Sequence, residues 1–349
     1  MHRRKFLKSA ALLGATAGTQ GVSFAQAQQA GMTSTGAGES ASRRIGTSAG
    51  PFTIRLAGYG PPETSFSRGL TEIGDRLTAK FGDAVDVRYV YNVMDVAYAA
   101  GDLSWLVRSG VLTGAYATLR ESIPELELAA LPFLFADTAS ARAAMDGPLG
   151  QAAARSIEAM LDVRVLGFFE NGFRHVSNNV RPVHVPADLR GLRIRVLPTQ
   201  IRTFELLGAE PVDMPLQAAI AALASGELDG QENPFANTVT YKIYPLQRYH
   251  TATYHSYLSR PVFVNRTQFE SWPRDLVTEV EAAAREAVAL QRRLKDEEEE
   301  QAAATIREAG GEIVELTASE RAQFVAAVAP IYDEAKAIFS PDQLALVGR

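Results

Sequence analysis

Residues 189–237 read LRGLRIRVLPTQIRTFELLGAEPVDMPLQAAIAALASGELDGQENPFAN. A short apolar strand is predicted over 192–196, and Arg193 and Arg195 share one face of it. Further along, residues 229–234 (DGQENP) form a polar tip. An arginine in a strand is usually paired with a surface carboxylate. Its rigid guanidinium fork, however, also suits a ligand carboxylate, which it binds through two parallel hydrogen bonds. The arginine and the polar tip together predict an anion clamp.

The composition is that of an ordinary globular protein. The 349 residues are enough for about two domains, and 46% hydrophobic residues can form buried cores. The formal net charge is −5 without a basic run beyond the N-terminus, which argues against nucleic-acid binding. The chain has no cysteine, and its five histidines lack metal-ligand spacing. We therefore expect no cofactor, no metal site among the histidines and no thiol chemistry, whereas a metal ion that bridges a ligand and the protein stays open.

Residues 1–25 have the layout of a signal peptide of the twin-arginine type. Arg3, Arg4 and Lys5 precede a short, mildly apolar stretch, as in such export signals. An uncleaved membrane anchor is the alternative, but the stretch is too short and too rich in glycine and threonine to span a bilayer. Residues 26–50 are rich in small and polar residues and predict a disordered linker. We expect the protein to be periplasmic.

Strands and helices alternate after the linker, which predicts an α/β protein with a mostly parallel sheet. Ligands bind at the carboxyl ends of the strands in such sheets, and Tyr59 and Tyr116 fall at these ends. Each tyrosine is either a ligand contact or a packing residue. The expected strands and helices of this part are 52–57, 63–81, 85–90, 103–109 and 111–117.

The second half of the chain contains a long helical segment, 275–309, dominated by Ala, Glu, Arg and Leu. Its acidic run 296–300 is expected to form a solvated face. Consecutive helix residues point in different directions, so they cannot converge on one cation. Two crossings between domains are expected, at the turn 170–175 and at 262–265. The remaining expected elements are a strand at 312–316 and a final helix at 317–339.

Several strings of the sequence resemble the solute-receptor subunits of tripartite ATP-independent periplasmic (TRAP) transporters. These strings are LRIRV at 192–196, NGFR at 171–174, DGQENP at 229–234, and the segments 131–135 and 146–151. The resemblance implies a two-lobe periplasmic binding protein of the α/β class, with hinge strands and a long helix spanning both lobes. The implied lobes are 51–171 plus 260–298 for lobe I and 172–259 plus 299–349 for lobe II.

The resemblance also implies a function without catalysis. A small organic acid would bind in the cleft between the lobes and be delivered to a TRAP permease in the membrane. Arg195 would form the main salt bridge to the ligand carboxylate, Arg174 would add a second charge, and Asn233 would fix the ligand's orientation. The resemblance thus implies that Arg195, Arg174 and Asn233 form the predicted anion clamp.

One segment departs from the family's pattern and leaves the identity of the acid open. After PVDM at 211–214, the family often has an aromatic residue, a glutamate and a tyrosine, whereas this chain has Leu216, Ala218 and Ile220. Leu216 and Asp213 are expected to line the pocket. Asp213 would either accept hydrogen bonds from ligand hydroxyls or cap the helix that starts near residue 215, and capping is the favoured interpretation.

Two other functions stay open on the sequence alone. A twin-arginine-exported enzyme acting on an organic acid would need a base, and His175 is the best candidate. Strand alternation points His175 away from Arg174, and the sequence offers no nucleophile motif. A receptor that docks to a sensor kinase, in place of a permease, would use the same binding site. We therefore expect a receptor and not an enzyme.

Overall fold

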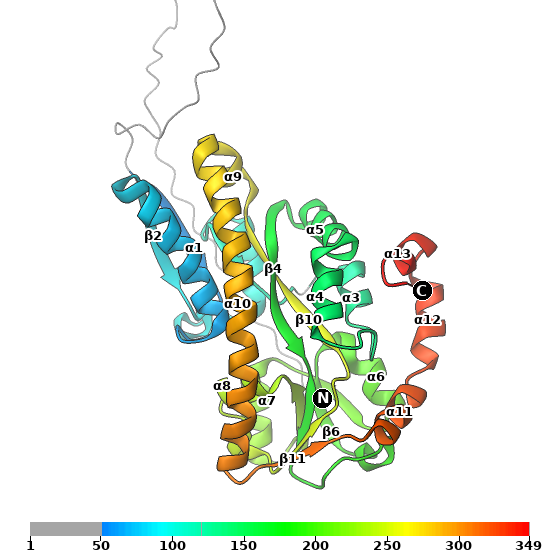
Figure 1. The fold of residues 1–349 in the computed structure, drawn as a ribbon. Helices are drawn as coiled ribbons and strands as arrows, with labels where there is room; N and C mark the ends of the chain where they lie inside the picture. The colour runs from blue at the N-terminus through cyan, green and yellow to red at the C-terminus, as the bar shows by residue number, and fades with distance from the viewer. Residues whose placement is uncertain (1–50, 120, 349) are drawn as a thin grey trace, which may run out of the picture. The chain divides into compact units, whose positions relative to one another are not determined.

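The computed structural model describes residues 51–119 and 121–348, so the predicted signal peptide and linker lie outside the described part. The strands form two sheets (Figure 1). In the first, which has the order β2-β1-β3-β10-β4, β1 pairs in parallel with β2 and β3, whereas β10 is antiparallel to β3 and β4. Its strands are β1 (Phe52–Ala57), β2 (Val85–Val90), β3 (Gly114–Tyr116), β4 (Val163–Phe173) and β10 (Tyr257–Asn265).

The second sheet has the order β11-β9-β5-β8-β6-β7. Two of its strands, β6 and β8, run parallel side by side, and β8 is antiparallel to β5. This places the predicted arginine strand next to the predicted polar tip. The strands are β5 (His175–Asn178), β6 (Arg193–Val196), β7 (Glu210–Asp213), β8 (Gly230–Asn233), β9 (Tyr249–Ala252) and β11 (Glu312–Glu315).

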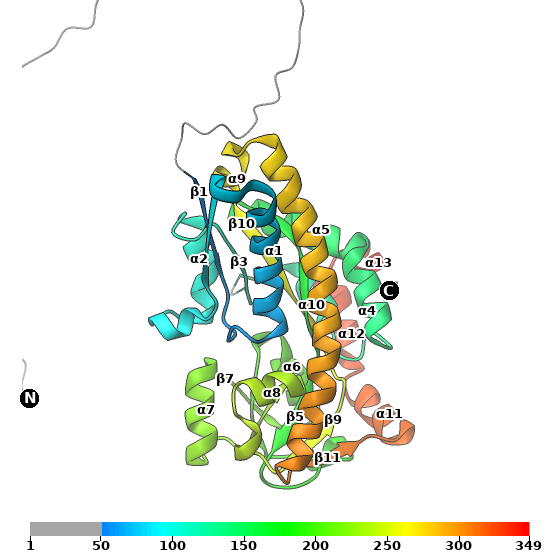
Figure 2. The same cartoon turned by 60° about the vertical axis from the view of Figure 1, so that its left-hand side comes forward.

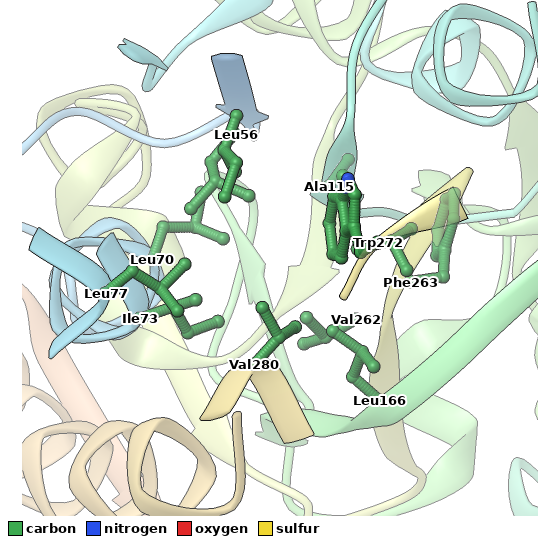
Figure 3. Close-up of a pocket in the computed structure, with 13 residues that line it drawn as sticks. Leu56, Leu70, Ile73, Leu77, Ala115, Leu166, Val262, Phe263, Trp272 and Val280 are labelled. Carbon is green, nitrogen blue, oxygen red and sulfur yellow. The ribbon is translucent and has the colours of Figure 1, made fainter. Parts of the chain in front are cut away.

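The helices of the first half pack around the first sheet. Thr64 caps α1 by accepting the Ser67 backbone N–H, and the apolar residues at helical spacing on α1 are buried. Figure 3 shows Leu70, Ile73 and Leu77 of α1 beside a cavity of about 10 Å³. A cavity this small and apolar is a packing gap and not a ligand site. The helices are α1 (Ser65–Phe81), α2 (Leu103–Arg108), α3 (Pro124–Ala129), α4 (Thr138–Asp146) and α5 (Pro148–Leu161).

Two short segments carry the chain between the sheets, and a third, longer passage leads from β10 of the first sheet to β11 of the second. Arg174 is the only residue between β4 and β5, which agrees with the predicted crossing at 170–175. The return crossing lies between β9 and β10, and the Arg174 N–H donates to the Ser256 carbonyl at 2.9 Å, joining the two crossings. The predicted crossing at 262–265 is wrong, because these residues lie inside β10 of the first sheet.

One helix, α10 (Arg274–Glu308), contacts elements of both sheets. Its 35 residues span about 52 Å at 1.5 Å per residue. It packs against β4 of the first sheet and the helix α1 beside that sheet, and against β11 of the second sheet and the short helix α8 (Figure 2). The prediction of a two-lobe α/β protein with one long helix spanning both lobes is confirmed. The remaining helices of this second half are α6 (Ile201–Leu206), α7 (Leu216–Ser225), α8 (Phe235–Thr240) and α9 (Arg266–Ser271).

The C-terminal segment differs from the single helix expected at 317–339. It forms α11 (Ala318–Ala327), α12 (Pro330–Ile338) and α13 (Pro341–Ala345), because Pro330 and Pro341 each start a new helix. Tyr332 of α12 donates its hydroxyl to the Pro132 carbonyl at 2.7 Å, and α13 contacts α3. The C-terminal helices therefore reach the helices beside the first sheet, and the predicted lobe boundaries stay a prediction.

Candidate functional site

A fully buried ion pair lies at the first crossing. Arg174 is 1% exposed and Glu232 of β8 is 0% exposed. The guanidinium donates to both carboxylate oxygens of Glu232 and, at 2.6 Å, to its backbone carbonyl. It also donates to Asn233 Oδ1 at 3.0 Å and to Asn171 Oδ1 at 2.9 Å. The charge of Arg174 is thus neutralised within the protein, and the side chain holds the end of β8 in place.

The surroundings of Glu232 keep it ionised. Burial alone would raise the pKa of Glu232, but the charge of Arg174, its hydrogen bonds and the nearby His255 outweigh burial and lower the pKa to about 2. The backbone N–H of Leu197 also donates to Glu232 Oε1 at 3.1 Å. Burial lowers the pKa of His255, so this imidazole is neutral at neutral pH. The carboxylate of Glu232 is therefore held by groups of the protein itself.

Arg195 of β6 is largely buried but differs from Arg174 in having no carboxylate within salt-bridge distance in the described part of the chain. It is 7% exposed, and its Nε donates to the Met214 carbonyl at 3.1 Å. Its two terminal nitrogens donate to no acceptor among residues 51–119 and 121–348. Burial lowers the pKa of Arg195, against the charge of Glu232, which acts to raise it. A guanidinium with two unused nitrogens has the donor fork that a carboxylate needs.

The neighbouring arginine of the same strand is already paired. Arg193 donates to Asp229 Oδ2 through its backbone N–H at 2.8 Å and through Nε at 3.0 Å, and to Oδ1 through Nη2 at 2.7 Å. The Asp229 carboxylate therefore binds the backbone and the side chain of Arg193. The charge pairing thus favours Arg195 over Arg193, as the sequence did, and ligand binding by Arg195 stays a prediction.

Asn233 ends β8 beside the arginine cluster and is 6% exposed. Its Oδ1 accepts from Arg174, and its amide nitrogen donates to Gln231 Oε1. Gln231 is itself held by Ser177 Oγ at 2.9 Å and by Thr238 Oγ1 at 3.2 Å. The Asn233 amide is therefore fixed in one orientation, which suits a group that orients a ligand.

The two predicted tyrosines, Tyr59 and Tyr116, differ in their hydrogen-bond partners. Tyr59 is 5% exposed, and its hydroxyl accepts from Arg260 Nε at 2.7 Å. Tyr116 is 0% exposed, and its hydroxyl accepts the Tyr59 N–H at 3.1 Å. A Cβ at Gly58 would lie 2.1 Å from the Tyr116 ring, so a glycine is needed there. Tyr116 has the packing role that the sequence left open and supports the loop that carries Tyr59.

Asp213 and Leu216 flank the start of α7. Leu216 is the first residue of this helix and is partly buried against a small apolar cluster that includes Ala219 and Ile243. Asp213 is exposed at the end of β7. The favoured expectation that Asp213 caps the helix is wrong, because Pro215 is the cap residue and α7 has no side-chain cap. Asp213 acts on Arg195 only through its charge, which raises the arginine's pKa.

Sequence reasoning missed a third buried arginine, Arg260 of β10, which is 6% exposed. Its Nη2 donates to Asn171 Oδ1 at 3.0 Å, and its Nη1 donates to the Ser259 carbonyl at 3.0 Å. Asn171 Oδ1 thus accepts from both Arg174 and Arg260. The available signal was a single arginine inside the mostly apolar strand YLSRPVFV, since a buried charge needs polar partners.

The acidic run of α10 is not a fully solvated face, which corrects the expectation for two of its members. Glu298 accepts from the backbone N–H of Ser65, where α1 begins, and from its hydroxyl at 2.7 Å. Glu299 accepts the backbone N–H of Phe235, where α8 begins, at 2.7 Å. Consecutive glutamates therefore cap one helix beside each sheet, because carboxylates stabilise helix N-termini.

His175 faces α10 and not the arginines, as strand alternation predicts. Its Nε2 lies 3.5 Å from Glu299 Oε1, and its ring lies 4.2 Å from the ring of Phe235. A cavity of about 70 Å³ beside it is lined by His175, Lys295 and Glu299, among others. Neither Arg195 nor Asn233 lines that cavity. The best candidate base for an enzyme thus lies beside a different cavity from the residues predicted to form the anion clamp.

The chain belongs to the bacterial extracellular solute-binding proteins, family 7, whose family model matches residues 107–337. Proteins of this family are receptors and not enzymes, in agreement with the expectation. In the part of the chain that is described, none of the helices has both the length and the apolar character required to cross a bilayer.

Two curated relatives and one solved structure illustrate the similarity. The chain is 34% identical to the 2,3-diketo-L-gulonate-binding periplasmic protein of Escherichia coli, over 55% of this chain and 58% of that protein. It is 29% identical to the C4-dicarboxylate-binding periplasmic protein of Rhodobacter capsulatus, over 81% of this chain and 86% of that one. A TRAP periplasmic solute-binding protein from Sulfurospirillum deleyianum with bound succinate matches with a TM-score of 0.79 and 26% identity, over 86% and 99% of the chains.

Proposed function

We propose that the protein is an extracytoplasmic solute receptor that binds a small organic acid between its lobes and delivers it to a TRAP permease. The observation that carries this proposal is Arg195, a guanidinium that is 7% exposed and has unused terminal nitrogens. A buried charge without a counter-ion is costly, and a ligand carboxylate would remove that cost. Membership of a solute-binding family supports the same conclusion.

The roles follow from the contacts of each residue. Arg195 holds the ligand carboxylate through its terminal nitrogens. Asn233 orients the ligand, and Arg174 acts mainly by fixing Asn233 and by neutralising Glu232. Of the other predicted site residues, Tyr59 presents its hydroxyl to the ligand, Asp213 and Leu216 line the site, and Tyr116 supports Tyr59.

The names of the similar proteins support an acid as the ligand class and a permease as the partner. They name a diketo sugar acid, C4-dicarboxylates and succinate, each of which carries a carboxylate. The succinate-bound protein is a TRAP periplasmic solute-binding protein. We extend this to a periplasmic location for the present protein, reached through the predicted signal peptide.

Identification of the ligand tests the proposal. The protein would be purified without denaturation, and the small molecules released from it would be identified by mass spectrometry. A thermal-shift screen of organic acids, sugars and amines should then show stabilisation by at least one acid, since a ligand that binds only the folded state raises the melting temperature. Stabilisation by neutral sugars or amines alone would contradict the anion clamp, and chemical conversion of the acid would indicate an enzyme.

A further inference from the structure

The charge balance of the buried arginines is uneven. Within the described residues, the arginines classed as buried are Arg174, Arg195 and Arg260, which are 1%, 7% and 6% exposed. Arg174 is paired with Glu232. For Arg195 and Arg260, residues 51–119 and 121–348 provide no carboxylate within salt-bridge distance. Other arginines of intermediate burial, such as Arg142 and Arg292, do have carboxylate partners.

The acceptors around Arg260 are neutral. Its nitrogens donate to the Tyr59 hydroxyl, the Asn171 amide oxygen and the Ser259 carbonyl. A guanidinium has five N–H donors, so Nη1 and Nη2 each keep one hydrogen beyond these bonds. Neutral acceptors satisfy the geometry of a buried cation but not its charge. The site therefore holds two buried positive charges in excess.

The two excess charges lie on opposite sides of the first crossing. Arg260 belongs to β10 of the first sheet, and Arg195 belongs to β6 of the second. Asn171 and Arg174 stand between them, since Asn171 Oδ1 accepts from both Arg174 and Arg260. Arg195 shares no hydrogen-bond partner with Arg260 among the described residues. Two anionic groups on one ligand would thus each meet a separate arginine.

We propose that Arg260 and Tyr59 form a second anion subsite, which makes the receptor selective for acids with two anionic groups. This inference rests on the proposed function, because it assumes that the first carboxylate binds to Arg195. One carboxylate would bind to Arg195 of the second sheet. The other would bind to Arg260 of the first sheet, with the Tyr59 hydroxyl beside it. A bound diacid would also link the two lobes, which already meet where the Tyr241 hydroxyl donates to the Tyr59 carbonyl at 3.4 Å.

Isothermal titration calorimetry with matched acids tests the subsite. The wild-type protein would be titrated at neutral pH with pairs that differ in one carboxylate, such as succinate with butyrate, glutarate with pentanoate, and galactarate with galactonate. We expect at least one diacid to bind roughly 10- to 100-fold more tightly than its monoacid partner, the value of one charge-assisted interaction. Equal affinity within the pairs that bind would overturn the subsite and leave the proposed function intact.

Two variants of Arg260 and one control complete the test. Arg260→Gln should weaken diacid binding by about 10-fold or more and change monoacid binding by less than about 3-fold, whereas Arg260→Lys should keep part of the preference. Arg88→Gln removes an exposed arginine of β2 and should change neither. Equal weakening of both acids by Arg260→Gln would mean that both arginines hold one carboxylate or that Arg260 only braces the crossing.

The variants also separate failure of folding from failure of the idea. Thermal unfolding without ligand shows whether Arg260→Gln is folded. If it is not folded, the diacid-to-monoacid affinity ratio of the wild type and the ratio of Arg260→Lys test the subsite. If no acid of any pair binds the wild-type protein, the proposed function fails and the subsite fails with it.

Discussion

Replacing Arg174 with methionine is expected to lower the stability of the protein first and its ligand affinity as a consequence. Arg174 and Glu232 are 1% and 0% exposed, and the guanidinium bonds to both carboxylate oxygens. Methionine keeps much of the side-chain volume but removes the charge. Within the described residues, the carboxylate of Glu232 then keeps one hydrogen bond, from the Leu197 N–H, with the neutral His255 beside it and the charge of Arg195 beyond salt-bridge distance.

The size of the effect follows from that burial. Breaking a buried ion pair by removing one partner costs about 3–5 kcal/mol. At about 2–4 °C per kcal/mol for a protein of this size class, the melting temperature should fall by roughly 6–20 °C. Adding Glu232→Gln removes the stranded charge, so the double variant should recover about 1–3 kcal/mol relative to Arg174→Met.

Thermal unfolding followed by circular dichroism measures all three variants, with Arg193→Met as the matched control. The Arg193–Asp229 pair is partly exposed, and its loss should cost about 1 kcal/mol or less. An Arg174→Met protein that melts with the wild type but no longer binds ligand would refute the reasoning. Arg174 would then be a direct ligand contact and not a residue that positions Asn233.

Two further predictions concern acid stability and the long helix. The folded pKa of Glu232 is about 2, below its ordinary 4.5, so its contribution is present above about pH 4.5 and is lost as the pH falls toward 2. Burial lowers the pKa of His250 to about 4 from 6.5. As the pH falls from 6.5, this imidazole is therefore protonated in the unfolded chain before it is protonated in the folded protein, which lowers stability. The melting temperature should therefore decrease from pH 7 to pH 4, and an increase would contradict both assignments. Glu299→Gln should cost about 1 kcal/mol or more, because the variant loses a helix-capping charge at α8 and leaves Lys295 unpaired. Glu300→Gln, at an exposed position, should be neutral in the same unfolding measurement.

The sequence predicted the parts of the fold that depend on local patterns. Alternating strands and helices predicted the strands of the first sheet, and the helix-favouring composition of 275–309 predicted α10. The first sheet is mixed, not mostly parallel as expected, because β10 runs antiparallel to both of its neighbours. The return crossing was predicted too late in the chain, because β10 is one continuous strand from Tyr257 to Asn265. Its apolar C-terminal half gives no local sign that the chain has already passed to the first sheet. The final helix was expected as one because its apolar spacing continues past Pro330.

Contacts between distant residues could not be predicted in the same way. Glu232 lies 58 residues from Arg174, and only the pairing of β5 with β8 brings the two together. The divergence of Glu298 and Glu299 on α10 was the reason for expecting no shared cation. It also lets one glutamate reach α1 and the other α8, a consequence that depends on how both helices pack. Arg260 was missed because its role appears only once Asn171 and Tyr59 lie beside it.

The central claim is that Arg195 binds the carboxylate of an organic acid. The most direct measurement is calorimetric titration of the wild type, Arg195→Gln and Arg193→Gln with the tightest acid found in the thermal-shift screen. Loss of a hydrogen-bonded charge partner costs about 2–5 kcal/mol, so Arg195→Gln should bind the acid roughly 30-fold or more weakly. Arg193→Gln, whose arginine is tied to Asp229, should keep the wild-type affinity. Wild-type affinity in Arg195→Gln would contradict the account.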